Sequence, residues 1–95
     1  MRSARCYVAG MTRGDLCALL FGIVPVTAID VARVACVSVD EVEAFYRTLR
    51  MAEMVDIDDE TGAWFRLHAE PAEAFMAKVS ALGIDIRQPV GRSAE

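Results

Sequence analysis

The sequence predicts a mainly α-helical domain with one small β-hairpin, and three observations support this fold class. A helix-start pattern, in which Ser or Thr precedes an acid by three positions, begins at Thr12, Thr27 and Ser38. After Met54 the apolar residues change from a spacing of about 3.6 residues to a spacing of about 2. Of the 95 residues, 55% are hydrophobic, which favours one packed domain over a disordered chain.

The first two start patterns each precede an apolar stretch with helical spacing. We expect a first helix at about residues 13–21, because Gly22 and Pro25 then interrupt the pattern. Its buried stripe comprises Leu16, Leu19, Leu20 and Ile23. A second helix is expected at about residues 28–36, with more apolar positions than one stripe needs, which predicts cover on two sides. These positions are Ile29, Val31, Ala32, Val34 and Ala35.

The third start pattern opens the longest helix, expected at about residues 39–54. The side chains expected to point inward are Val42, Phe45, Tyr46 and Leu49. Those expected to face solvent are Asp40, Glu41, Glu43, Arg47 and Arg50. A fourth helix follows Pro71 and ends at Gly83, because Pro fits a first helical turn and Gly commonly ends a helix. Its apolar face consists of Phe75, Met76, Val79 and Leu82.

Between these last two helices, alternating residues predict a hairpin at about residues 55–67, with a turn at 59–62 where Gly62 can adopt a positive φ. We expect Ala63, Phe65 and Leu67 to point into the core, which leaves Trp64 outside as an anchor for a partner. Packing of Trp64 under the fourth helix is the alternative. The domain core is expected at about residues 12–83, and residues 84–95 are expected to form a loose tail.

Cysteine usage and hydropathy indicate a soluble cytoplasmic protein. Cys6, Cys17 and Cys36 are odd in number and contain no Cys-x-x-Cys pair, so we expect buried reduced thiols, with a ligand or nucleophile role as the alternative. No uncharged stretch approaches the roughly 18 apolar residues of a membrane span. Residues 1–10 lack the apolar run of a secretion signal.

The order of expected elements from Thr27 to Leu67 resembles that of winged helix-turn-helix domains. A small residue stands at Ala32, where the first helix of the motif contacts the later one, and an apolar residue stands at Val42, where that later helix crosses. Residues 37–38 resemble the turn into the recognition helix, and residues 49–55 resemble its exit into the wing. The chain departs from the family at Cys36, where the tight turn usually has Gly.

The resemblance implies DNA binding through the third helix and the wing, but the charges oppose it. Residues 37–66 contain eight acids and three bases, and a surface of this sign repels phosphate. When the residues are matched to the family position by position, the surface that would face the major groove of DNA consists of Val39, Asp40, Glu41, Glu43, Ala44 and Arg47. The wing tip would consist of Asp58, Asp59, Glu60, Thr61 and Gly62.

We therefore expect a regulatory module whose acidic third helix and wing bind a basic protein partner, with a DNA-binding transcriptional regulator as the alternative. The partner-binding residues are Asp40, Glu41, Glu43, Arg47, Asp56, Asp58, Asp59, Glu60 and Trp64. By analogy, phage and mobile-element inhibitors of nucleic-acid machinery, anti-CRISPR proteins among them, are similarly short and acidic. For any single acid, a helix-start or solvated-turn role remains the simpler interpretation.

We expect no enzyme activity, cofactor or metal. One histidine, His68, cannot assemble a nucleophile with its base and orienting group. Asp56, Asp58 and Glu60 resemble the start of a calcium loop, but Gly62 comes one position late and no closing acid follows. The apolar face of the fourth helix, Phe75, Met76, Val79 and Leu82, is either core or the contact of a homodimer, and we favour the dimer.

Overall fold

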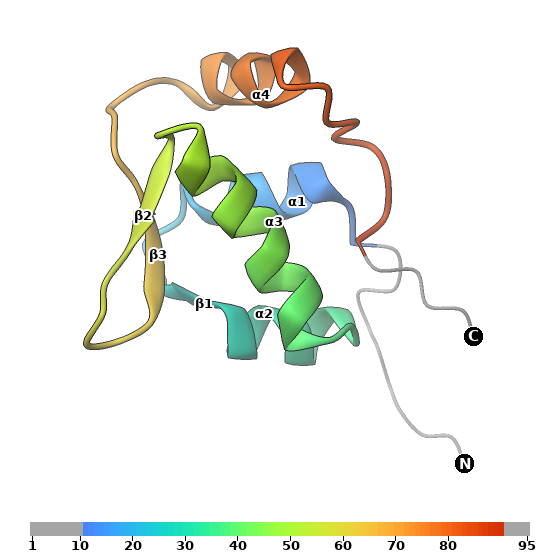
Figure 1. Cartoon of the computed structure of the whole chain (residues 1–95), viewed down its shortest axis with the longest axis vertical. Helices are drawn as coiled ribbons and strands as arrows, with labels where there is room; N and C mark the ends of the chain where they lie inside the picture. Colours follow the sequence, from blue (N-terminus) through green and yellow to red (C-terminus); the bar gives the residue numbers. More distant parts are fainter. Residues whose placement is uncertain (1–10, 91–95) are drawn as a thin grey trace.

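A computed structural model of the chain describes residues 11–90, which form four helices and a three-stranded antiparallel sheet (Figure 1). The elements are α1 (Arg13–Leu19), β1 (Val26–Thr27), α2 (Ala28–Ala35), α3 (Val39–Met51), β2 (Val55–Ile57), β3 (Ala63–Arg66) and α4 (Ala72–Ala81). The four predicted helices and the predicted hairpin are present, and β1 is an addition. No helix in the described part of the chain has the length and apolar run needed to cross a membrane.

The three predicted Ser/Thr helix-start patterns are confirmed by their capping side chains, whereas α4 starts after Pro71, which caps it with no side-chain hydrogen bond. The hydroxyls of Thr12, Thr27 and Ser38 accept hydrogen bonds from backbone N–H groups three residues later, at 3.1, 3.2 and 3.1 Å. At α1, Thr12 and Asp15 form a capping box, in which each side chain binds the backbone of the other. The Thr12 N–H donates to the Asp15 carboxylate at 2.9 Å. At the other end of α2, Cys36 takes the left-handed conformation, with φ of 59°, that glycine usually supplies.

The sheet has the order β1-β3-β2, so the hairpin contributes two strands and the two residues before α2 contribute the third. Val26 lies opposite Trp64, and Asp56 lies opposite Phe65. A two-residue strand is too short to show alternation, and Thr27 also serves as the helix cap, so β1 could not be predicted from the residue pattern.

The predicted inward and outward faces of β3 are wrong. Trp64 is 5% exposed, whereas Phe65 and Leu67 are 44% and 45% exposed. The Trp64 ring packs against Tyr46 of α3 with centroids 5.5 Å apart, and the larger indole fills the space beneath that helix. Arg66 shares this inner face: its Nε donates to the Leu20 carbonyl and its guanidinium lies 4.0 Å from the centre of the Phe21 ring.

The core forms where the four helices and the sheet meet. Its largest fully buried side chains are Tyr46, Phe75, Leu16, Leu49, Val42, Val55, Val79 and Cys17. The inward residues predicted for α3 are all buried. The predictions for the first two helices are partly wrong: Leu19 of α1 is exposed, and Ile23 lies beyond α1 in an exposed loop. The helix α2 is covered on one side only, because Ile29 and Val34 are exposed.

Residues 84–90 are not a loose tail. They run along the start of α1, where the N–H groups of Arg13 and Gly14 donate to the carbonyls of Gln88 and Ile86 at 3.0 and 2.7 Å. The first N–H groups of a helix have no partners inside the helix, so this segment satisfies them. The Val90 N–H also donates to the Met11 carbonyl at 2.9 Å. The prediction for residues 91–95 lies outside the described residues.

The apolar face of α4 belongs largely to this core. Phe75 and Val79 are fully buried, and the Phe75 ring meets Phe21 edge-on with centroids 5.5 Å apart. Met76 is half-buried, and only Leu82 is exposed among the four residues predicted to form a dimer contact. That prediction is wrong for Phe75 and Val79, because burying them against a second copy would first require pulling them out of the core.

We expect Tyr46→Phe to lower the free energy of unfolding by about 1–2 kcal/mol, because the buried hydroxyl donates to the Leu16 carbonyl. That hydrogen bond is 2.8 Å long and joins α3 to α1. The measurement is urea denaturation followed by circular dichroism. Thr48→Val is the control on the same helix, since the Thr48 hydroxyl donates only to the Ala44 carbonyl within α3. Equal stability of the Phe variant and the wild type would contradict the role given to this hydrogen bond.

Candidate functional site

The predicted acidic residues lie on α3 and the hairpin, which stand side by side on the face shown in Figure 1. One cluster occupies the first two turns of α3 and consists of Asp40, Glu41 and Glu43. The other occupies the hairpin turn and consists of Asp58, Asp59 and Glu60. All are exposed except Glu43, which is half-buried. The helix and the hairpin diverge from the corner between Met51 and Val55, so the two clusters stand at separate ends of this face (Figure 1).

The arginines of this face are already paired with carboxylates. Arg47 contacts Glu43 at 3.1 Å, and Arg50 contacts Asp56 at 3.0 Å across the corner between α3 and β2. The third arginine of the segment, Arg66, is directed to the inner side of the sheet. Exposed ion pairs are worth little and can rearrange, but they leave the face without surplus positive charge. The exposed acids at the two ends therefore make the net charge of this face negative.

Exposed apolar side chains, together called the apolar area, stand on the outer side of the hairpin and at the end of α3. Phe65 is exposed opposite Asp56, Leu67 is exposed at the end of β3, and Met51 is 85% exposed at the end of α3. The sequence analysis assigned the exposed aromatic position to Trp64, which the structure buries. It missed Phe65 because β3 is apolar on both faces, and alternation alone then leaves the inward phase undecided.

The histidine and the cysteines have structural surroundings. The His68 ring lies with Nε2 3.0 Å from the carbonyl of Glu53, a residue that holds a positive φ of 63°. Cys17 is free and fully buried, and burial raises the pKa of its thiol from 9.0 to about 12, which makes it a poor nucleophile. Cys36 is exposed, so the prediction of a buried thiol is wrong there, and Cys6 lies outside the described residues. The cap position of Cys36 places it at the end of α2, outside the core.

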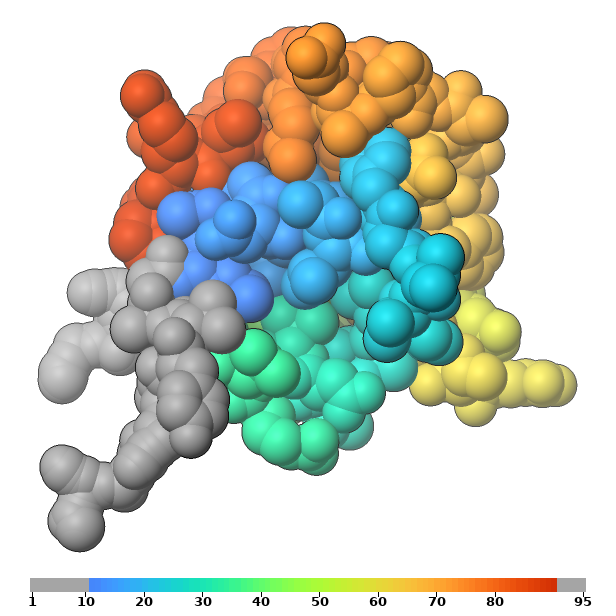
Figure 2. All heavy atoms as spheres, turned by 180° about the vertical axis from the view of Figure 1, so that it is seen from behind, coloured from blue at the N-terminus to red at the C-terminus, as the bar shows by residue number. Residues whose placement is uncertain are grey.

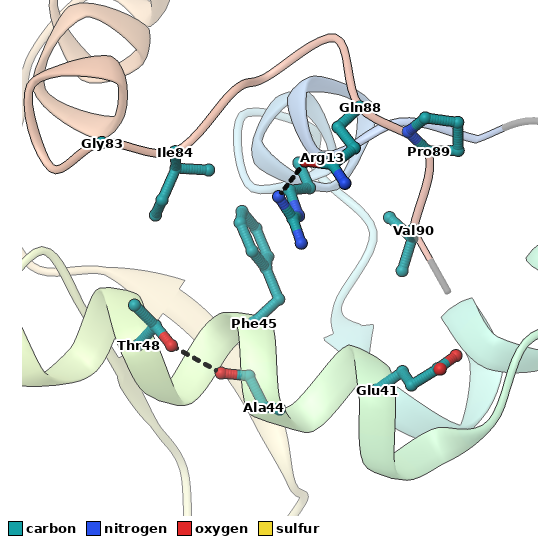
Figure 3. Close-up of a pocket in the computed structure, with 10 residues that line it drawn as sticks. All are labelled: Arg13, Glu41, Ala44, Phe45, Thr48, Gly83, Ile84, Gln88, Pro89 and Val90. Atoms are coloured by element: carbon teal, nitrogen blue, oxygen red, sulfur yellow. Dashed lines mark hydrogen bonds between the residues drawn. The ribbon is translucent and has the colours of Figure 1, made fainter. Parts of the chain in front are cut away.

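A groove of about 510 Å³ separates α3 from the C-terminal segment (Figure 3). Phe45 and Ile84 project into it, and Arg13 enters from α1 with its guanidinium donating to the Gln88 side chain at 2.8 Å. Sequence patterns could not reveal this groove, because it exists only when residues 84–90 dock on α1. Among the described residues, no three His, Cys, Asp or Glu side chains are grouped as metal ligands.

We expect the free energy of unfolding to fall as the pH rises from about 9 towards about 12, at up to about 1.4 kcal/mol per pH unit for one group. The folded-state pKa of the Cys17 thiol is raised by burial, so the unfolded chain ionises first and gains stability relative to the folded chain. Urea titrations between pH 8 and 9 measure this, because the tyrosines of the unfolded chain, with a pKa of about 10, remain largely protonated there. Cys17→Ala should reduce the slope; an unchanged slope would contradict the assignment.

No family model matches this chain, and neither a curated protein nor a solved structure matches it. The chemistry of its own residues therefore carries any proposal about its function.

Proposed function

We propose that this chain is a non-catalytic winged-helix module that binds a basic protein partner through α3 and the hairpin. The order of elements supports the winged-helix interpretation, because α2 and α3 are joined by a short turn and the hairpin directly follows α3. The left-handed conformation of Cys36 supports it as well, since it supplies the geometry for which the family usually has glycine.

The observation that carries the proposal is the charge state of this face. Asp40, Glu41 and Asp59 are exposed at its two ends, and no ion pair involves them within residues 11–90. Both exposed arginines are already balanced by carboxylates. Nucleic acid would meet net negative charge where phosphate contacts need Lys or Arg, whereas a basic protein would be attracted.

The apolar area supplies the part of an interface that charge alone cannot. Protein interfaces combine an apolar centre that excludes water with a polar rim, and a few anchors carry most of the affinity. Phe65 provides exposed apolar surface on the hairpin, and Met51 and Leu67 provide it where α3 and β3 end. A protein that itself binds nucleic acid has the basic surface such a site needs, as the target of a phage or mobile-element inhibitor would.

The second candidate is a DNA-binding transcriptional regulator. It is favoured by the position of α3, which lies beside the hairpin on an open face, as a recognition helix must (Figure 1). An acid can accept a hydrogen bond from cytosine, but only when basic neighbours hold the phosphate backbone. The two candidates differ in the sign of charge that the partner presents.

We expect no retarded complex when the protein at about 10 μM is mixed with pooled random duplex DNA in about 50 mM salt. The reason is that the exposed face carries net negative charge and its arginines are paired. An electrophoretic mobility shift series from low to moderate salt measures this. Salt-sensitive duplex binding with a steep slope would instead establish the DNA-binding regulator.

We expect Asp40→Lys with Asp59→Lys to lower the recovery of basic partner proteins at least about tenfold, since each acidic cluster loses an attractive charge. The measurement is affinity capture from a lysate with the immobilised protein, followed by quantitative mass spectrometry of the retained proteins and their isoelectric points.

Glu73→Lys with Asp85→Lys is the matched control, because it changes the net charge equally at two exposed positions on α4 and the C-terminal segment. It should leave the captured set unchanged. Equal losses in both double variants would show that overall charge, and not this face, retains the proteins.

A further inference from the structure

The outer side of α2 is an apolar surface that no other part of residues 11–90 covers. Ile29 is 59% exposed and Val34 is 50% exposed, while the opposite side of the helix is buried. Those buried residues are Ala28, Val31, Ala32 and Ala35. The helix does not need these large β-branched side chains for its own packing. Exposed apolar side chains of this kind indicate a surface that binds another molecule.

The charges on this side of α2 are arranged symmetrically about the middle of the helix. Asp30 and Arg33 form an exposed ion pair at 3.2 Å. Each stands next to an apolar residue, so the outer positions read apolar, acid, base, apolar from Ile29 to Val34. Reversing the direction of the helix exchanges acid for base and apolar for apolar. An antiparallel copy of α2 therefore places Asp30 opposite Arg33, and Arg33 opposite Asp30.

The apolar surface continues from α2 toward α1. A groove of about 630 Å³ lies between them, lined by Leu19, Val24, Val26, Val31 and Val34. The connecting segment adds Ile23, which is 99% exposed, and Val24, which is 72% exposed. Figure 2 shows α1 (blue), the connecting segment (cyan) and α2 (green) on one face of the molecule, turned away from the view of α3 in Figure 1.

We infer that this face binds a second copy of the chain in a two-fold dimer, with the two α2 helices antiparallel. A two-fold contact requires that residue i of one copy meet residue j of the other, and that j meet i. The exchange of Asp30 with Arg33 between copies meets this condition, and Ile29, Val34 and the connecting segment supply the apolar area. The dimer uses a different face from the partner site on α3 and the hairpin, so either can fail without the other.

The test is a pair of charge reversals examined separately and together. Asp30→Arg and Arg33→Asp each place like charges opposite one another in the dimer, so each should raise the dimer dissociation constant at least about tenfold. Mixed in equal amounts, the two variants should associate as a heterodimer, because every contact is then between opposite charges. Sedimentation equilibrium from about 5 to 500 μM, with one variant carrying a fluorescent label, measures both effects.

Two further variants keep the test decisive. The double variant Asp30→Arg with Arg33→Asp restores the opposite charges within one chain and should dimerise like the wild type, even if a single reversal disturbs the fold. The double variant Glu43→Arg with Arg47→Glu reverses an ion pair on α3, away from this face, and should leave the dimer unchanged. A wild type that stays monomeric throughout this range would overturn the inference, and so would single variants that dimerise as well as the wild type. Binding of a basic peptide to this face by a monomeric wild type would overturn it too.

Discussion

The buried side chain of Tyr46 fixes where α3 stands relative to the rest of the molecule. Its hydroxyl donates to the Leu16 carbonyl of α1, and its ring packs against Trp64 of β3 and Phe45 of its own helix. One residue thus joins two helices and the sheet, and burial raises the pKa of its hydroxyl well above its ordinary value. The candidate face depends on this contact, because it is made of α3 on one side and the hairpin that follows β2 on the other.

Helix positions could be predicted from the sequence because their signals are local. A hydroxyl at Thr12, Thr27 or Ser38 acts on an N–H group three residues away, and Gly62 and Gly83 adopt the positive φ expected of them. The failures concern contacts between distant segments. Residues 84–90 were expected to be loose, because nothing in their own composition shows that the first turn of α1 needs their carbonyls.

The predictions for the inward faces of β3 and α2 were wrong for a different reason, which is that both elements carry more apolar residues than one buried face needs. Both sides of β3 carry large apolar or long side chains, so the pattern was compatible with either phase, and the size of the Trp64 ring decided it. On α2 the surplus was interpreted as cover from two sides, whereas the described residues cover only one. The acids of the candidate site were placed on the expected elements, but their separation into two clusters depends on how α3 and the hairpin diverge.

The hydrogen bond between the Val90 N–H and the Met11 carbonyl brings the two ends of the described chain together. Met11 and Val90 therefore lie at the same corner of the domain, away from the hairpin turn (Figure 1). A tag or fluorescent protein joined directly at Met11 or Val90 would therefore begin at that corner, away from the acidic turn. Joining these ends by a short peptide and reopening the chain at an exposed loop is the corresponding route to a circular permutant.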